Sequence, residues 1–173
     1  MKLANQLRKI LDPNLCDKKA YQRFQQRIEE GKLIRKDNKK SHFCVYFLPF
    51  NPKTQKVFIV HHKKANLWVS AGGHIEKGES ISEAFAREAK EELGITLNKN
   101  QTKNPFLFTV TDIDNPPQVC RVHFDIWHLI LTDGDTFKVD SQEFYESRWA
   151  TLSQARKLVT DSNHLKAFSL LSS

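Results

Sequence analysis

The chain has 173 residues, of which 39% are hydrophobic, 10% aromatic and 27% charged. A chain of this length buries about 70% of its unfolded surface, and the composition excludes a disordered protein, a collagen or a coiled coil. The net charge is +7, and residues 1–40 hold all of the excess, with 12 Lys and Arg against 5 Asp and Glu. We therefore expect one folded domain, residues 41–173, preceded by a basic extension, residues 1–40, that packs on the domain or flanks it.

Neither membrane insertion nor secretion is indicated by the sequence. The longest apolar stretch, residues 43–50, has eight residues and contains Pro49, whereas a membrane span needs about 20. Charged residues interrupt the first nine positions, so a secretory signal is not expected. Cys16, Cys44 and Cys120 have no short spacing, which predicts free, buried thiols instead of a disulfide framework or a paired-cysteine zinc site. We expect a cytoplasmic protein with no membrane partner.

The predicted elements alternate between helices and strands along the chain. Helical spacing at 3–11 and 17–31 predicts two helices, and 42–50 and 56–62 are expected to form a hairpin. A short extended segment at 67–70 precedes a glycine-containing loop at 71–79 and a helix at 80–93. Strands are expected at 106–110, 118–132 and 144–151, and helices at 152–159 and 164–171. This order predicts an α/β fold, a sandwich with a mixed sheet between helices.

The helix at 80–93 has an unusual distribution of acidic residues. Ser80 with Glu83 forms a capping box and Gly94 supplies a C-terminal stop, so the limits of the helix are well defined. Its apolar positions define one face, and helical geometry places Glu88 and Glu92 on or beside that face, with Glu91 next to them. Carboxylates this close together repel one another, and burying them adds a desolvation cost. The arrangement is therefore unfavourable unless a cation compensates the negative charge. Oxygen ligands favour Mg²⁺ or Mn²⁺ for that cation.

The segment before the helix supports the same interpretation. Gly72 and Gly73 allow the backbone to approach a metal ion or a phosphate closely. Glu79 and Arg87 are near enough to form an ion pair that ties this loop to the helix. We expect that pair to act as a structural brace.

The spacing of these residues is similar to the complete signature box of the Nudix hydrolase family. Gly73 is followed after five residues by Glu79 and after seven more by the run from Arg87 to Ile95. The resemblance implies an α/β/α sandwich that hydrolyses a pyrophosphate bond in a nucleoside diphosphate linked to another moiety. It also implies that Glu88, Glu91 and Glu92, with a carbonyl of Gly72 or Gly73, hold Mg²⁺, for which Mn²⁺ can substitute.

The general base is left open by the sequence. Glu91 or Glu88 can serve, and so can Glu143 or Glu146, which lie before Trp149 where several family members have an additional glutamate. A carboxylate in this role would orient and deprotonate the attacking water.

Weaker signals concern the substrate. On the strand at 118–132, one face carries Arg121, His123, Asp125 and Trp127, and it either meets substrate or is an ordinary half-solvated face. Trp68 either stacks on a base or packs in the core. His61, His62 and His74 form no zinc-binding spacing, although Gly-Gly-His at the box is similar to an uncharacterised bacterial subgroup.

The substrate is not identified by the sequence. Ala71 stands where Nudix loops often have proline, and Thr109, Val110 and Thr111 occupy the region where proline or tyrosine marks two known substrate classes. A nucleotide-type small molecule is the expected partner, and nucleic acid is not. The alternatives are a nucleotide-sensing Nudix module with weak catalysis, and isopentenyl diphosphate isomerase, whose cysteine and histidine-rich metal site the sequence does not assemble.

Overall fold

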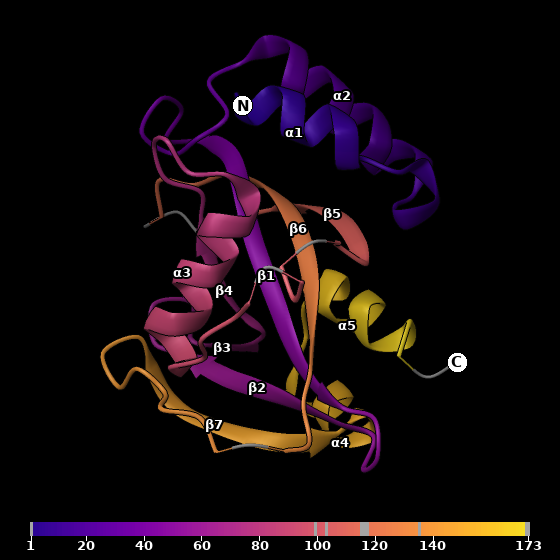
Figure 1. The fold of residues 1–173 in the computed structure, drawn as a ribbon, viewed down its shortest axis with the longest axis vertical. Helices are drawn as coiled ribbons and strands as arrows, with labels where there is room; N and C mark the ends of the chain where they lie inside the picture. Colours follow the sequence, from indigo (N-terminus) through magenta and orange to yellow (C-terminus); the bar gives the residue numbers. More distant parts are fainter. Residues whose placement is uncertain (1, 99, 103, 115–117, 135, 172–173) are drawn as a thin grey trace.

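A seven-stranded mixed sheet organises the computed structural model, which describes residues 2–98, 100–102, 104–114, 118–134 and 136–171 (Figure 1). Its strands are β1 (Ser41–Asn51), β2 (Lys56–His62), β3 (Leu67–Val69), β4 (Ala71–His74), β5 (Leu107–Asp112), β6 (Val122–Leu131) and β7 (Phe144–Thr151). The helices are α1 (Leu3–Ile10), α2 (Lys18–Glu30), α3 (Ile81–Leu93), α4 (Leu152–Leu158) and α5 (Ser162–Ser169), with a 3₁₀ turn, η1 (Pro13–Leu15). Helices lie on both faces of the sheet, which confirms the predicted sandwich.

Strand β1 is the centre of the sheet and explains its mixed character. It runs parallel to β6 over ten residue pairs, from Ser41 opposite Val122 to Phe50 opposite Leu131. On its other edge it runs antiparallel to β4. The predicted hairpin between β1 and β2 is therefore short, with two registered pairs at Phe50–Asn51, and β2 then pairs with β3 and β7.

Two predicted boundaries were wrong. Residues 71–74 were expected in a loop but form β4, because the main chain of Ala71–His74 pairs with β1 and needs no large side chains. The strand predicted from residue 118 begins at Val122, where the parallel pairing with β1 starts.

One face of the sheet is covered by α3 and by the two N-terminal helices (Figure 1). Phe24 of α2 is fully buried, and its ring contacts Phe43, Phe108 and Phe124 with centroids 5.2–5.6 Å apart. Burying such a side chain stabilises the fold by about 2–3 kcal/mol. The N-terminal helices therefore share the hydrophobic core of the sheet.

The other face of the sheet packs against α4 and α5. Trp127 of β6 stacks on Tyr46 of β1 with centroids 4.9 Å apart, and His164 of α5 meets the Trp127 ring edge-on at 4.8 Å. Cys44 and Cys120 are buried free thiols as predicted, whereas Cys16 is only half-buried because it lies beside the surface turn η1. Among the residues that the structure describes, no helix has the length and apolar character needed to cross a membrane.

Candidate functional site

Helix α3 begins and ends at the residues that the sequence predicts. The Ser80 hydroxyl accepts a hydrogen bond from Glu83 N, and the Glu83 carboxylate accepts one from Ser80 N at 2.8 Å. Gly94 ends the helix in the left-handed conformation. The predicted apolar face is buried against the sheet, so the register that positions the acidic residues is confirmed.

Two of the three acidic residues of α3 lie against the glycine pair of β4. Glu88 and Glu92 are only 8% and 7% exposed, whereas Glu91 is exposed. Gly72 N donates a hydrogen bond to Glu92 Oε2 at 2.6 Å. A Cβ atom at Gly73 would lie 2.6 Å from Glu88 Cδ and 2.8 Å from its Oε2, so the approach of this carboxylate requires glycine there.

Arg87 connects the acidic residues with the segment before the helix. Its Nε and Nη2 atoms donate to the two oxygens of Glu79 at 2.6 and 3.0 Å. Its Nη1 atom donates to Glu88 at 2.8 Å and to Glu91 at 3.0 Å, and Nη2 also donates to the carbonyl of His74 at 3.0 Å. The geometry has the form of the predicted brace between Glu79 and Arg87.

The carboxylates of this cluster differ in their pKa. Burial raises the pKa of Glu92 well above its usual value, and the negative charges of Glu88, Glu143 and Asp140 add to the effect. Burial also raises the pKa of Glu88, although Arg87 opposes this. Burial acts in the same direction on Glu79, but hydrogen bonds from Arg87 and from Glu76 N outweigh it and lower the pKa. The Glu88–Glu92 pair thus holds negative charge at a high energetic cost.

The residues present fit a hard divalent cation. Two buried carboxylates face a strand without side chains at Gly72 and Gly73, and the donor atoms are all oxygen, which suits Mg²⁺ better than softer metals. A cation between them would relieve the repulsion that raises the pKa of Glu92. The backbone carbonyl of Gly73 or Gly72 remains the expected additional ligand.

The two glutamates outside the box have different surroundings. Glu143 O accepts a hydrogen bond from Lys63 N at 2.9 Å, and its carboxylate lies 3.6 Å from His62 Nε2. The negative charge of Glu143 contributes to raising the pKa of Glu92, so Glu143 lies on the same side of the molecule as the acidic cluster. Glu146 instead pairs with Arg148 at 2.6 Å.

The predicted substrate face of β6 is only partly available. Asp125 and Trp127 are fully buried, and α5 covers Trp127, so at these two positions the face is neither half-solvated nor open to substrate. Arg121 is exposed and donates to the carbonyls of Gln118 and Cys120. Trp68 is half-buried, stacks on His61 at 5.3 Å and has the Arg148 guanidinium over its ring at 4.7 Å.

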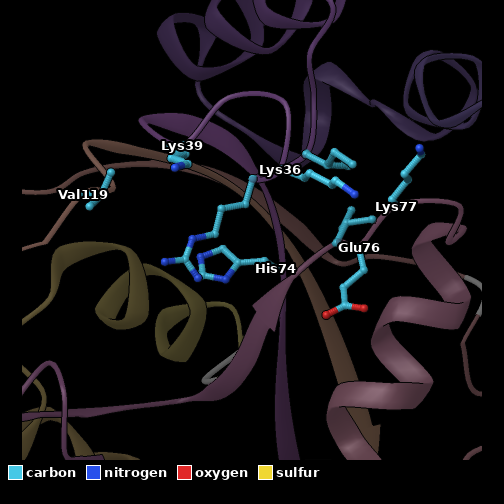
Figure 2. Close-up of a pocket in the computed structure, with 9 residues that line it drawn as sticks. Lys36, Lys39, His74, Glu76, Lys77 and Val119 are labelled. Carbon is cyan, nitrogen blue, oxygen red and sulfur yellow. The ribbon is translucent and has the colours of Figure 1, made fainter.

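A basic pocket lies beside the box and was not identified from the sequence. Its volume is about 620 Å³, and it is enclosed by residues 34–39, by His74–Lys77 at the end of β4, and by Val119. Figure 2 shows Lys36 and Lys39 on the connector, and Glu76 and Lys77 in the segment that leads to α3. Four cationic side chains line the pocket, namely Arg35, Lys36, Lys39 and Lys77. One carboxylate, that of Glu76, lines it as well. The basic run at 32–40 was the only sequence signal for it.

The structure also assembles a histidine cluster that the sequence did not reveal. The ligand atoms of His42, His74, Cys120 and His123 all lie within 4.8 Å of one another. The structure thus brings together a cysteine and three histidines that could not be assembled from the sequence alone. The three histidines come from β1, β4 and β6, whose pairing register brings them together, and Cys120 lies two residues before β6.

Comparison with known proteins identifies a family for the part of the chain that follows the N-terminal helices. The family model described as "NUDIX domain" matches residues 40–171. A Bacillus subtilis protein named as an uncharacterised Nudix hydrolase, YvcI, is 37% identical over 60 residues, which is 35% of this chain and 38% of that protein. The segments matched in the curated relatives span at most 43% of each relative's length.

Solved structures show the same fold at lower identity. A NUDIX-family hydrolase from Clostridium perfringens has a TM-score of 0.59 and 23% identity, covering 76% of this chain and 96% of the other. The dihydroneopterin triphosphate pyrophosphohydrolase of E. coli has a TM-score of 0.57 and 17% identity, covering 74% and 92%. Both agree with the mixed sheet and flanking helices described above.

Proposed function

The chain belongs to the Nudix hydrolase family, and on that premise we propose that it is a Mg²⁺-dependent hydrolase of a pyrophosphate bond in a nucleoside diphosphate linked to another moiety. The observation that carries the proposal is the pair of buried carboxylates, Glu88 and Glu92, held against Gly72 and Gly73. Two buried carboxylates that repel each other destabilise a fold, and a bound cation would offset that cost.

Each residue of the box has a role in this proposal. Glu88, Glu91 and Glu92, with the Gly73 carbonyl, would hold Mg²⁺, which when bound neutralises the pyrophosphate oxygens and polarises phosphorus. Arg87 fixes Glu88 and Glu91 through its two Nη1 hydrogen bonds, and Glu79 fixes Arg87. These contacts hold the carboxylates in place before substrate arrives, so little reorganisation is needed during the reaction.

Glu143 is the proposed general base. Its carboxylate is half-exposed and reachable by water, and its negative charge acts on Glu92. It would accept the proton of the attacking water as the water oxygen bonds to one phosphorus and the bond from that phosphorus to the bridging oxygen breaks, which releases two phosphate-bearing fragments. Glu91 and Glu88 remain the alternatives, and the Glu143→Gln variant described below separates them.

The basic pocket suits the anionic part of the substrate. Arg35, Lys36, Lys39 and Lys77 supply positive charge, and His74 and Glu76 connect the pocket to the strand and loop of the box. Such a cleft concentrates anions near the acidic cluster and offsets its repulsion of phosphate. Trp68, Arg121 and His123 stay predicted substrate contacts, and His123 is also a member of the histidine cluster.

A turnover assay tests the proposal. The protein is incubated with Mg²⁺ or Mn²⁺ and each of a panel of nucleoside triphosphates, nucleotide sugars, ADP-ribose, dinucleotides and dihydroneopterin triphosphate, and the phosphate-bearing products are separated and quantified by chromatography. Glu88→Gln and Glu92→Gln should each lower turnover at least tenfold, because each removes ligand charge at nearly constant volume. Glu29→Gln, an exposed position on α2, is the matched control and should retain full activity. Equal activity of the Glu88 and Glu29 variants would refute the site.

Isomerisation of isopentenyl diphosphate is a second candidate, favoured by one observation. The sequence argument against it was the lack of a cysteine with a histidine-rich site, and the cluster of His42, His74, His123 and Cys120 supplies both residue types. Incubation with isopentenyl diphosphate and detection of dimethylallyl diphosphate decides between the two activities.

Tight nucleotide binding without turnover of any compound would instead indicate a sensing module.

A further inference from the structure

We propose that His42, His74, His123 and Cys120 bind one Zn²⁺ ion at a structural site, separate from the acidic cluster, that fastens the box to the centre of the sheet. The four ligand atoms lie within 4.8 Å of one another. Three imidazoles and one thiolate form a nitrogen and sulfur donor set, which favours Zn²⁺ over Mg²⁺ or Ca²⁺.

The distances within the cluster agree with tetrahedral zinc. Cys120 Sγ lies 3.7 Å from His42 Nε2 and 4.0 Å from His74 Nε2. Zn–S and Zn–N bonds of about 2.3 and 2.05 Å at tetrahedral angles separate sulfur and nitrogen by about 3.6 Å. Movements of a few tenths of an ångström would therefore bring these two pairs to ligand distances.

The three imidazole rings are arranged around a common point. Their centroids are 4.7–5.2 Å apart, and each pair of rings is inclined by 50–81°, so none of them stacks face to face. His42 and His123 are directly opposite on parallel strands, and His74 enters from β4 on the other edge of β1. Rings held this way by three strands need little rearrangement to share one ion.

The hydrogen-bonding state of His42 and of His123 favours a bound ion. His42 Nδ1 lies 2.9 Å from Asn38 O. A hydrogen on Nδ1 donates to this oxygen, which leaves the lone pair of Nε2 free to bind a metal ion. Metal-bound histidines usually have such a partner on the second nitrogen. His123 Nε2 is buried and makes no hydrogen bond with the residues that the structure describes. An unpartnered buried nitrogen beside three other donors is costly without an ion.

The site has both a route for entry and a connection to the box. His74 lines the basic pocket, and Val119 next to Cys120 lines it too, so the cluster borders a solvent-filled space. The carbonyl of His74 accepts the hydrogen bond from Arg87 Nη2, and Gly73 before it contacts Glu88. An ion bound to the His74 ring would thus hold in place the residue whose carbonyl accepts a hydrogen bond from Arg87. Binding converts the Cys120 thiol to a thiolate and releases its proton to solvent.

Metal analysis of the full chain tests the proposal. The protein is purified from zinc-supplemented cells and dialysed against excess Mg²⁺ to saturate the acidic cluster, and its zinc is then measured. We expect about one zinc per chain in the wild type and less than a tenth of that in Cys120→Ala. Cys44→Ala is the matched control: Cys44 is also buried on β1, opposite His74, and belongs to the neighbouring set Cys44, His123 and Asp125. This variant should retain the ion.

A second measurement does not depend on folding of the variants. Chelator-stripped wild-type protein is titrated with Zn²⁺ or Co²⁺ and followed by thermal melting and absorbance. At 1,000 times the dissociation constant, Zn²⁺ should raise the melting temperature by about 10 °C. Co²⁺ should give the intense visible bands of a tetrahedral ion with a thiolate charge-transfer band, which Cys120→Ser removes.

The outcomes separate this site from the proposed active site. Zinc that persists in Glu88→Gln/Glu92→Gln but not in Cys120→Ala supports the proposal. Loss of zinc in the glutamate variant alone, or in Cys44→Ala with retention in Cys120→Ala, overturns the ligand set. A wild-type chain that carries no zinc and shows no thermal shift overturns the site. None of these results depends on catalysis.

Discussion

A methyl group added at Gly73 should move the Glu88 carboxylate while leaving the fold intact. In the structure the new Cβ would lie 2.6 Å from Glu88 Cδ, whereas ordinary contacts begin at 3.4 Å. The carboxylate must therefore withdraw by about 0.8 Å or more, and its hydrogen bond from Arg87 Nη1 is lost or lengthened. Misplacement of a catalytic group by about 1 Å costs on the order of 10²-fold in rate. We expect kcat/KM of Gly73→Ala to fall by roughly ten- to a hundredfold.

Gly72→Ala provides the contrast. Gly72 has a φ of 147°, and a Cβ there would meet the main chain of Val45 and lie 2.7 Å from Tyr46 Cα, so the backbone of β1 would have to move. This substitution should lower the melting temperature by several degrees, since a strained backbone costs about 1–3 kcal/mol. The three atoms nearest to a Cβ at Gly73 all belong to the Glu88 side chain, which can move, so Gly73→Ala should melt within about 3 °C of the wild type.

The assay for Gly73→Ala is a double-mutant cycle with Glu88→Gln. If the methyl group acts by displacing Glu88, the double variant should be about as active as Glu88→Gln alone. Full activity of Gly73→Ala at saturating Mg²⁺, or independent effects that multiply in the double variant, would refute this reasoning.

Three further predictions concern other parts of the chain. Phe24→Ala should destabilise the protein by about 3–5 kcal/mol and lower its melting temperature by about 10 °C, because the ring contacts three phenylalanines of the sheet; a shift under 2 °C contradicts this packing. Glu143→Gln should lower kcat by about 10²–10⁴-fold with KM little changed, and an effect under threefold returns the base to the box. In Asp161→Asn the cap of α5 is kept but the charge is lost. Although burial opposes it, the hydrogen bond with His164 lowers the pKa of Asp161 below 3.8. The stability that the lowered pKa adds is fully present above pH 3.8 and is lost as the pH falls through the lowered pKa. In urea melts the variant should therefore be about 1 kcal/mol less stable than the wild type at pH 7, and this difference should shrink as the pH falls below 3.8.

Local features of the chain were predictable, and features that depend on strand pairing were not. The limits of α3 and the inward position of Glu88 and Glu92 follow from caps and helical spacing within fourteen residues. The strand character of Ala71–His74 has no local signal, since Gly72 and Gly73 have no β preference and their pairing with β1 decides it.

The histidine cluster was missed for the same reason. His42 and His123 are 81 positions apart, and only the parallel register of β1 and β6 places them opposite each other. The burial of Trp127 depends in turn on α5, which begins 35 residues after it. Alternation along β6 indicated two faces but not which of them a helix covers.

The parallel pairing of β1 with β6 has a consequence for synthesis of the chain. Ser41 leaves the ribosome 81 residues before Val122, its partner, and at about 5–20 residues per second this takes roughly 4–16 s. During that interval the nascent chain can pair β1 with β4 and dock α3, but the opposite edge of a strand rich in phenylalanine stays open. Chains truncated before Val122 should therefore need a chaperone to stay out of aggregates, although they contain the entire signature box.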